Sequence, residues 1–590
     1  MKNALSYAGN RTLVWMRSLN GLLSVILISL LLMLIAFISH NPILRFPDDA
    51  QFGIFSLIPV EYWVALALSF ILMIANVTNE KRYHFLISMI FFIVVFVDIE
   101  SFFLHNPVGT TDAFGHYLTG VNLADSSNVF FSTDPLTSYP QLYFGSFIFS
   151  KMLAELLGLN LIATVPVLAI FRLIMPIWFF VCMYFLLTKL VPKTKARIIT
   201  IVMIMAIPHL QFHYSPFAFG LIILPLLIYT IIVPTPDFHK NLLIQAILFT
   251  FLMLTHGPLT IYIVPAYAVT VFLHYGLKST RNSRAHLNVS MPLAVCFIIG
   301  MSIFNPLFNH LFFATLDKFG LSATMAYCNV FSGMGYFNPG LQPIGLLGLE
   351  RLGGNYAVSE FIRMYVLGVF ALIAFFGTLS IFKNKKFTGV NMFILGGFFS
   401  TGIFLVGSLF YPSLNMTDRA FLYLEFGSVL MLIFLLPDDF IHKLKEFCEI
   451  DKSKAFNIFI ILILLSPAIG SLAYHYNQQG YFQPPQNEGR SAFTLTHVES
   501  AHIYQYWDNS KFTTLKPSDY PGKLIYVSLT DFNPDSPNLY PDGTFVVMSD
   551  STRFMFLFEE KTEHCDSIIS YCNENMNRVY SSPGNSVWYI

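Results

Sequence analysis

Charged residues are scarce in this chain of 590 residues. Asp, Glu, Lys and Arg make up 12% of it, about half of the 25% that is usual in soluble proteins. Neither sign is in excess, because 34 basic residues balance 34 acidic ones. There is therefore no basic surplus to neutralise the phosphates of a nucleic acid. Hydrophobic residues make up 55% of the chain, which excludes disordered and collagen-like classes and indicates an integral membrane protein.

Cysteine is also scarce, with six in the whole chain. Four of them are scattered without the spacing of a metal site: Cys182, Cys296, Cys328 and Cys448. Cys565 and Cys572 stand seven positions apart in a region that we expect outside the membrane, where disulfides persist. A disulfide between these two is favoured, and two free thiols are the alternative.

Apolar runs that could cross the roughly 30 Å of bilayer hydrocarbon recur along residues 1–474. We therefore predict an all-α polytopic membrane protein of about 13 transmembrane helices. The predicted spans are Leu19–Ile38, Glu61–Val77, Phe85–Leu104, Leu161–Leu187, Ile198–Ile207, Phe217–Val233, Leu242–Leu254, Leu259–Leu273, Met291–Phe308, Phe361–Ile381, Val390–Phe410, Phe421–Leu436 and Phe456–Ala473. A further apolar stretch, Tyr139–Leu157, is interpreted as a helix at the outer face that does not cross. Counting it as a span would reverse the side of every later loop.

The distribution of Lys and Arg predicts the orientation, because cytoplasmic loops are enriched in them. With the N-terminus in the cytoplasm, 20 basic residues fall on the cytoplasmic side and 4 in outer loops. Leu19–Ile38 is too long for the apolar core of a cleavable signal peptide. We predict a multi-pass protein of the cell membrane with a cytoplasmic N-terminus and an extracytoplasmic C-terminal region.

Residues 475–590 differ in composition from the rest and form the second predicted domain. They hold 13 acidic and 7 basic residues and no spanning run. Lys523–Leu529 and Thr544–Met548 have the pattern of strands, and Asp, Pro and Gly turns separate them. Glu499–Trp507 is expected to form a short helix. The prediction is a transmembrane module at 1–474, followed by a small extracytoplasmic α/β domain at 475–590.

The outer loop 105–138 concentrates acidic residues where basic ones are absent. Asp112 precedes His116 by four positions, so the two side chains would share one face of a helix. A carboxylate there could take a proton from a hydroxyl nucleophile. Asp98 and Glu100, at the end of a span, are alternative acids, and a merely solvated loop is the alternative to a functional one. The other long outer loop, 309–360, is expected to line the entrance for an acceptor.

Several short segments together resemble the GT-C superfamily, whose members are membrane glycosyltransferases that take a sugar from a polyprenyl-phosphate carrier. Asp112-Ala-Phe-Gly-His116 resembles the family's catalytic Asp segment, and Ser138–Tyr143, with Tyr139 before a proline, resembles its Tyr-Pro element. Further segments are similar to those of uncharacterised archaeal-type members: Tyr214–Phe217, Thr255–Pro258, Thr417–Phe421 and Asn577–Trp588. The resemblance implies a GT-C-like fold and Asp112 as the general base.

The same resemblance implies that a cation binds the leaving phosphate of a polyprenyl- or dolichyl-phosphate sugar. Arg419 is the first candidate, because it opens a span on the outer side and arginine binds phosphate oxygens bidentately; a structural or snorkelling role is the alternative. Other candidate substrate-binding residues are His116, Tyr139, His256, Arg172 and Arg363. No spacing demands a metal, although the His and Asp residues could hold a divalent cation.

The expected partners are the membrane, a lipid-linked sugar donor and an acceptor that is a protein, a lipid or a glycan. Three other functions fit the same sequence. A transporter or lipid-linked-glycan flippase would favour ionisable residues within spans and inverted repeats. An O-antigen ligase or polymerase would also have long outer loops, and a non-catalytic scaffold would display the acidic domain as a binding module.

Overall fold

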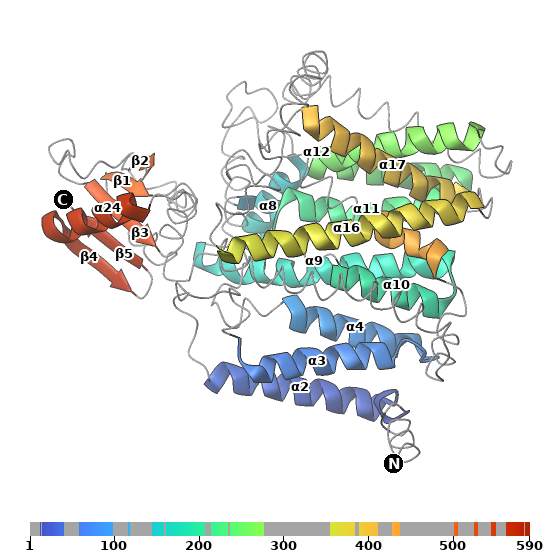
Figure 1. The fold of residues 1–590 in the computed structure, drawn as a ribbon, viewed down its shortest axis with the longest axis horizontal. Coiled ribbons are helices and arrows are strands. Elements are labelled where there is room, and N and C mark those ends of the chain that lie inside the picture. The colour runs from blue at the N-terminus through green and yellow to red at the C-terminus, as the bar shows by residue number, and fades with distance from the viewer. Residues whose placement is uncertain are drawn as a thin grey trace.

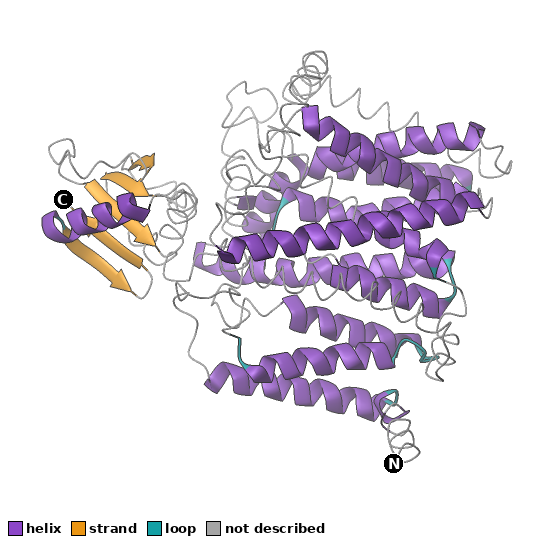
Figure 2. Cartoon of the chain, in the orientation of Figure 1, coloured by secondary structure: helices purple, strands orange, loops and turns teal. Residues whose placement is uncertain are grey.

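The computed structural model describes residues 12, 14–39, 58–97, 116–117, 144–157, 161–206, 214–233, 237–276, 354–383, 389–410, 427–436, 501–505, 524–528, 544–549, 562–582 and 585–589. Described residues up to 436 are mainly helical, whereas the strands and one helix lie from residue 501 onward. Figures 1 and 2 show the two groups as a body of helices and a separate sheet with its own helix. A mainly helical region followed by a small α/β unit agrees with the predicted order of elements.

The helical body contains helices labelled as in Figure 1: α2 Leu19–Ser39, α3 Val60–Ala75, α4 Arg82–Val97, α8 Phe144–Leu157, α9 Leu161–Leu190, α10 Lys193–Ala206, α11 Pro216–Ile232, α12 Phe238–Gly276, α16 Gly354–Lys383 and α17 Gly389–Phe410. Most follow the predicted apolar runs within a few residues. The predicted spans Met291–Phe308 and Phe456–Ala473 lie outside the described residues, and Phe421–Leu436 is described from residue 427.

Two described stretches, Leu19–Ser39 and Val167–Leu190, are long and apolar enough to cross a membrane by length and composition. Shorter apolar helices accompany them, including Val60–Ala75 and Arg82–Val97. A buried core helix, or a signal sequence near the N-terminus, meets the same two criteria, so these stretches alone indicate membrane association only weakly. At 14 residues, α8 is about 21 Å long, which is short of a bilayer span.

A break at His256 divides α12 into two helices. Its backbone angles, φ −153° and ψ 84°, are not helical. The prediction of separate helices at Leu242–Leu254 and Leu259–Leu273 is therefore confirmed. The first of the two packs along α11, because the side-chain amides of Asn241 and Gln245 both donate to the carbonyl oxygen of Thr230, at 2.9 and 2.8 Å.

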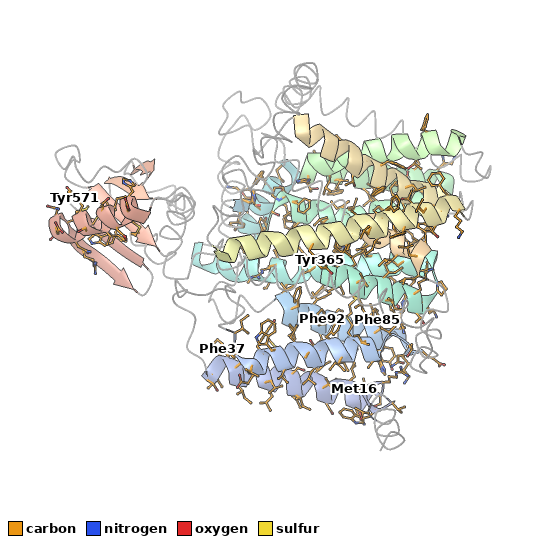
Figure 3. All side chains as sticks on the ribbon, viewed as in Figure 1. Met16, Phe37, Phe85, Phe92, Tyr365 and Tyr571 are labelled. Carbon is orange, nitrogen blue, oxygen red and sulfur yellow. The ribbon has the colours of Figure 1, made fainter. Side chains whose placement is uncertain are left out.

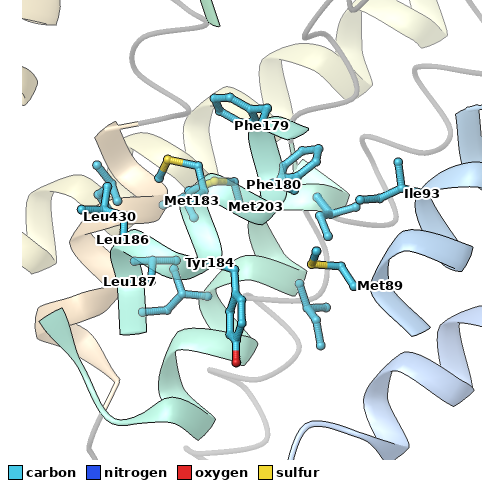
Figure 4. Close-up of a cluster of buried hydrophobic side chains, with 14 of the residues drawn as sticks. Met89, Ile93, Phe179, Phe180, Met183, Tyr184, Leu186, Leu187, Met203 and Leu430 are labelled. Atoms are coloured by element: carbon cyan, nitrogen blue, oxygen red, sulfur yellow. The ribbon is translucent and has the colours of Figure 1, made fainter. Parts of the chain in front are cut away.

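One hydrophobic core joins the helices. Met89 and Ile93 of α4 belong to the same cluster as Phe180 and Tyr184 of α9, and Figure 4 shows these side chains between the two helices. α10, α11, α16 and α17 contribute to this cluster as well. The helices that contribute to this cluster thus form one body.

Two arginines hold the turn that follows α3. Arg17 donates from Nε to the carbonyl oxygen of Ala75 at 2.9 Å. Arg197, which is buried, donates from Nη1 at 2.5–3.2 Å to three carbonyl oxygens, those of Asn76, Val77 and Asn79. The C-terminal end of a helix carries partial negative charge, so cations stabilise it. We refer to this arrangement as the arginine clamp.

The C-terminal sheet has the strand order β2-β1-β3-β5-β4. Its strands are β1 Ala501–Gln505, β2 Leu524–Ser528, β3 Thr544–Ser549, β4 Asn577–Ser582 and β5 Asn585–Tyr589. β1 pairs in parallel with both β2 and β3, whereas β5 is antiparallel to β3 and β4. The predicted strands at Lys523–Leu529 and Thr544–Met548 are confirmed. The helix expected at Glu499–Trp507 is wrong, because Ala501–Gln505 is the strand between β2 and β3.

The helix α24, Thr562–Asn575, covers this sheet and excludes the predicted disulfide. Its buried Ile568 and Cys572 contact Val546 of β3 and Trp588 of β5. Cys572 is a free thiol. Since Cys565 and Cys572 lie on one helix, seven residues separate them by about 10 Å along its axis, beyond the Cα separation that a disulfide allows.

Candidate functional site

Tyr117 follows the Asp112–His116 segment directly and is buried. Its side chain is 2% exposed, and its ring meets the ring of Tyr214 edge-on with centroids 5.8 Å apart. The Tyr214 hydroxyl lies 2.6 Å from Oγ of Ser150 in α8. Three hydroxyl-bearing residues that are far apart in sequence therefore meet at one place. Tyr117, Ser150 and Tyr214 are called the hydroxyl cluster below.

Local sequence explains why these elements meet. Ser215 caps α11 by accepting a hydrogen bond from the amide of Ala218 at 3.3 Å, and Pro216 suits the first helical position because it has no N–H to satisfy. Tyr214 thus stands just before a sharp helix start. Gly145 lets α8 approach α12, since a Cβ there would lie 3.0 Å from the backbone of Leu254.

Aromatic rings surround the cluster. Phe171 of α9 meets Tyr214 at 5.3 Å between centroids, and Phe147 of α8 lies 6.2 Å from the ring of His116. Phe149 and Phe219 continue the aromatic contacts with Phe171. Hydroxyl groups set among aromatic faces are suited to a ligand that combines apolar surface with hydroxyls, as a sugar ring does.

Burial raises the pKa of Tyr214 well above its ordinary range. The hydrogen bond with Ser150 opposes this rise, and the nearby Tyr117 adds to it. Tyr214 is therefore a neutral phenol at physiological pH, able to donate one hydrogen bond and to accept others.

His256 lies against the same first turn of α11. Its ring meets Phe217 edge-on at 5.2 Å, and its Nδ1 accepts a hydrogen bond from the amide of Leu259 at 3.2 Å. His256 therefore acts as the N-cap of the second helix within α12, three residues before the amide that it satisfies. Its predicted role in substrate binding is not needed to explain this arrangement.

Arg172 donates from Nη2 to the carbonyl oxygen of Val97 at the end of α4, at 3.0 Å, and is buried. It follows Phe171 directly, so it projects about 100° around α9 from the side that faces Tyr214. Arg172 thus stabilises the end of α4, close to the hydroxyl cluster but on a different side of its helix.

The remaining predicted site residues fall where less is described. Asp112, Tyr139 and Arg419, and the alternative acids Asp98 and Glu100, lie outside the described residues. Arg363 falls within α16. Among the described residues, no group of three or more His, Cys, Asp or Glu side chains could hold a metal ion. Of the predicted residues, the structure brings His116 and His256 to the surroundings of the hydroxyl cluster.

Sequence reasoning did not select Tyr117, Ser150 and Tyr214 as site residues. Tyr117 adjoins His116, and Tyr214 is the first residue of the segment Tyr214–Phe217, so both lie in or beside segments that carry the family resemblance. Ser150 had no such signal, because it pairs with Tyr214 across 64 positions. In comparisons with known proteins, no family model matches the chain and no curated protein matches it.

Proposed function

We propose that the protein is an integral membrane glycosyltransferase that takes a sugar from a polyprenyl- or dolichyl-phosphate carrier at the outer face. Asp112 would act as the general base and Arg419 would bind the leaving phosphate. The observation that carries the proposal is the placement of His116 and Tyr117. These residues end the Asp112 segment and lie in an aromatic, hydroxyl-bearing corner formed by α8, α9 and α11.

The outward faces of the helices support a membrane location. In α9, Ile170, Ile174 and Trp178 recur every fourth residue and are 46–54% exposed. α16 has the same pattern in a set of large apolar side chains that are 40–55% exposed: Leu372, Phe375, Phe376, Leu379 and Phe382. A helix on the surface of a soluble protein would be polar on this face, whereas lipid favours apolar side chains there.

α2 is apolar on its outward side as well. The helix has no charged residue, yet only 33% of its most apolar 18-residue stretch is buried. Figure 3 shows Phe37 near one end of α2 and Met16 beyond the other, with further side chains projecting away from the bundle between them. A helix of 21 residues is about 31 Å long, which matches the hydrocarbon core of a bilayer.

The two ends of the bundle differ in charge, as the proposed orientation requires. The arginine clamp gathers Arg17 and Arg197 at the turn between α3 and α4, and Arg82 donates to Thr188 near the end of α9 at 3.3 Å. The hydroxyl cluster lies toward the opposite ends of these helices, where Arg172 meets Val97. Figure 1 shows the sheet beside that opposite end, toward which α2 runs. A basic cytoplasmic end and an outer catalytic end agree with this arrangement.

The chemistry would proceed in one displacement. Asp112 accepts the proton of the acceptor hydroxyl while the acceptor oxygen forms a bond to the anomeric carbon of the sugar. The bond between that carbon and the phosphate oxygen breaks, and its electron pair leaves with the carrier phosphate. A guanidinium offers two parallel hydrogen bonds to the phosphate, which stabilise the charge that develops.

The test is transfer by the purified full-length protein in nanodiscs, with polyprenyl-phosphate hexoses as donors and release of polyprenyl phosphate as the readout. Asp112→Asn should lower transfer by about 10²–10⁴-fold, the usual contribution of a general base. Asp125→Asn, an acid of the same loop, is the matched control and should keep most of the activity. Near-normal transfer by a well-folded Asp112→Asn protein would refute the assignment of the base.

A further inference from the structure

The hydroxyl of Tyr117 is buried and has no hydrogen-bond partner among the residues that the structure describes. Most buried polar groups in folded proteins are paired, so an unpaired phenol needs an explanation. The ring itself is well packed against Tyr214, which means that the side chain is held in place while its O–H remains unused.

The hydrogen bonds of Ser150 and Tyr214 have a defined donor and acceptor order. Ser150 donates from Oγ to the carbonyl oxygen of Ser146, one turn earlier in α8, at 3.0 Å. The single hydroxyl hydrogen of Ser150 is thereby used. In the 2.6 Å contact between Ser150 and Tyr214, Tyr214 must therefore be the donor, and its own oxygen keeps accepting capacity.

The cluster consequently offers an unused donor on Tyr117 and an accepting oxygen on Tyr214. The rings of the two tyrosines meet edge-on with their centroids 5.8 Å apart. A phosphate or carboxylate can only accept hydrogen bonds and would satisfy Tyr117 alone, whereas a hydroxyl accepts one bond and donates another. The complementary ligand group is therefore a hydroxyl.

We propose that Tyr117, Ser150 and Tyr214 form a subsite that binds one hydroxyl group of a carbohydrate. Tyr117 donates to the sugar oxygen, the sugar hydroxyl donates to the oxygen of Tyr214, and Ser150 fixes the orientation of Tyr214. The rings of Phe171 and Phe219 provide apolar surface beside Tyr214. The subsite rests on the proposed function for the source of the sugar, which is the lipid-linked donor or a glycan acceptor.

Equilibrium binding to the full-length protein in nanodiscs tests the subsite. The probes are polyprenyl-phosphate hexoses, their single-deoxy analogues, free oligosaccharides of the same hexoses and the bare polyprenyl phosphate. Tyr117→Phe should weaken binding of one sugar-bearing probe class by about 3- to 10-fold, the range for one neutral hydrogen bond. The deoxy analogue that lacks the bound hydroxyl should be insensitive to the substitution, as should the bare carrier.

Stability of the unliganded protein gives a second readout. Tyr117→Phe removes an unpaired buried hydroxyl and should not lower the thermal unfolding temperature, because no hydrogen bond is lost. Tyr62→Phe is the matched control. Its buried hydroxyl donates to the carbonyl oxygen of Val95 at 2.8 Å, so its removal should lower the unfolding temperature and leave sugar binding unchanged.

The outcomes separate the subsite from the proposed function. Binding that depends on Tyr117 and on one sugar hydroxyl, without any transfer by the wild-type protein, would support the subsite and count against the glycosyltransferase. Normal transfer with unchanged binding by Tyr117→Phe would overturn the subsite alone. Absence of sugar binding by the wild-type protein, or an equal loss with every deoxy analogue, would overturn it as well.

Discussion

Gly396 of α17 faces α12 with no room for a methyl group. A Cβ at this position would lie 3.2 Å from the backbone nitrogen of Thr270, and closer still to the carbonyl oxygen of Ala266 and to Oγ1 of Thr270. These two oxygens are themselves joined by a hydrogen bond of 2.5 Å. Backbone atoms of a helix cannot move aside as a flexible side chain can. A methyl group at position 396 would therefore force α12 and α17 apart.

The expected effect of Gly396→Ala is the sum of two opposed contributions. Alanine in a helix interior is favoured over glycine by about 1 kcal/mol. Overpacking of a well-packed contact costs about 1–3 kcal/mol, and this contact is at the upper end because backbone atoms form it. We expect a net loss of about 1–2 kcal/mol in the free energy of unfolding.

Gly402, on the same helix, is the matched control, because no atom of the described part of the chain lies within 4 Å of a Cβ built there. Gly402→Ala should be neutral or stabilising by up to about 1 kcal/mol. The measurement is thermal unfolding of both purified variants in one detergent, followed by tryptophan fluorescence. If Gly396→Ala unfolds at the same temperature as Gly402→Ala or above it, the close approach of α12 and α17 is refuted.

Two further predictions concern other parts of the chain. Arg197→Met should lower the free energy of unfolding by about 1–3 kcal/mol, because the carbonyl oxygens of Val77 and Asn79 lose the hydrogen bonds that Arg197 donates, whereas that of Asn76 still accepts from the amide of Asn79. The exposed Arg82→Met is the control, with a loss below about 1 kcal/mol, and equal losses would contradict the clamp. Burial raises the pKa of the Cys572 thiol to about 12, so iodoacetamide at pH 9–10 should leave it unmodified in the folded protein, as peptide mass spectrometry would show. Since the unfolded thiol has a pKa of 9.0, this contribution to stability is complete below pH 9 and is lost as the pH rises toward 12. Cys572→Ala should reduce that loss, and rapid alkylation at pH 9 would show that the thiol is not buried.

Local pattern predicted the elements that depend on few neighbours. The apolar runs located most described helices, and the Thr255–Pro258 segment located the break in α12, because Gly and Pro next to His256 oppose a continuous helix.

Features that depend on distant pairing were not predictable. Ala501–Gln505 is short and ambiguous by periodicity, and its place between two parallel strands decides that it is extended. The prediction of a disulfide was wrong because the spacing of Cys565 and Cys572 in the sequence does not show that both residues lie on one helix. In the hydroxyl cluster, Tyr214 contacts Ser150, which lies 64 positions earlier in the sequence, and Tyr117, which lies earlier still. No short sequence motif predicts contacts between segments so far apart.

The strand order of the small domain has a consequence for its biogenesis. β5 is the last strand in sequence, yet it lies between β3 and β4 and carries the buried Trp588. While residues 585–589 are still inside the ribosome, β3 has an unpaired edge and the core under α24 lacks its largest side chain. The sheet can therefore close only after β5 emerges, and until then the exposed edge of β3 is a site at which chaperones or proteases can act.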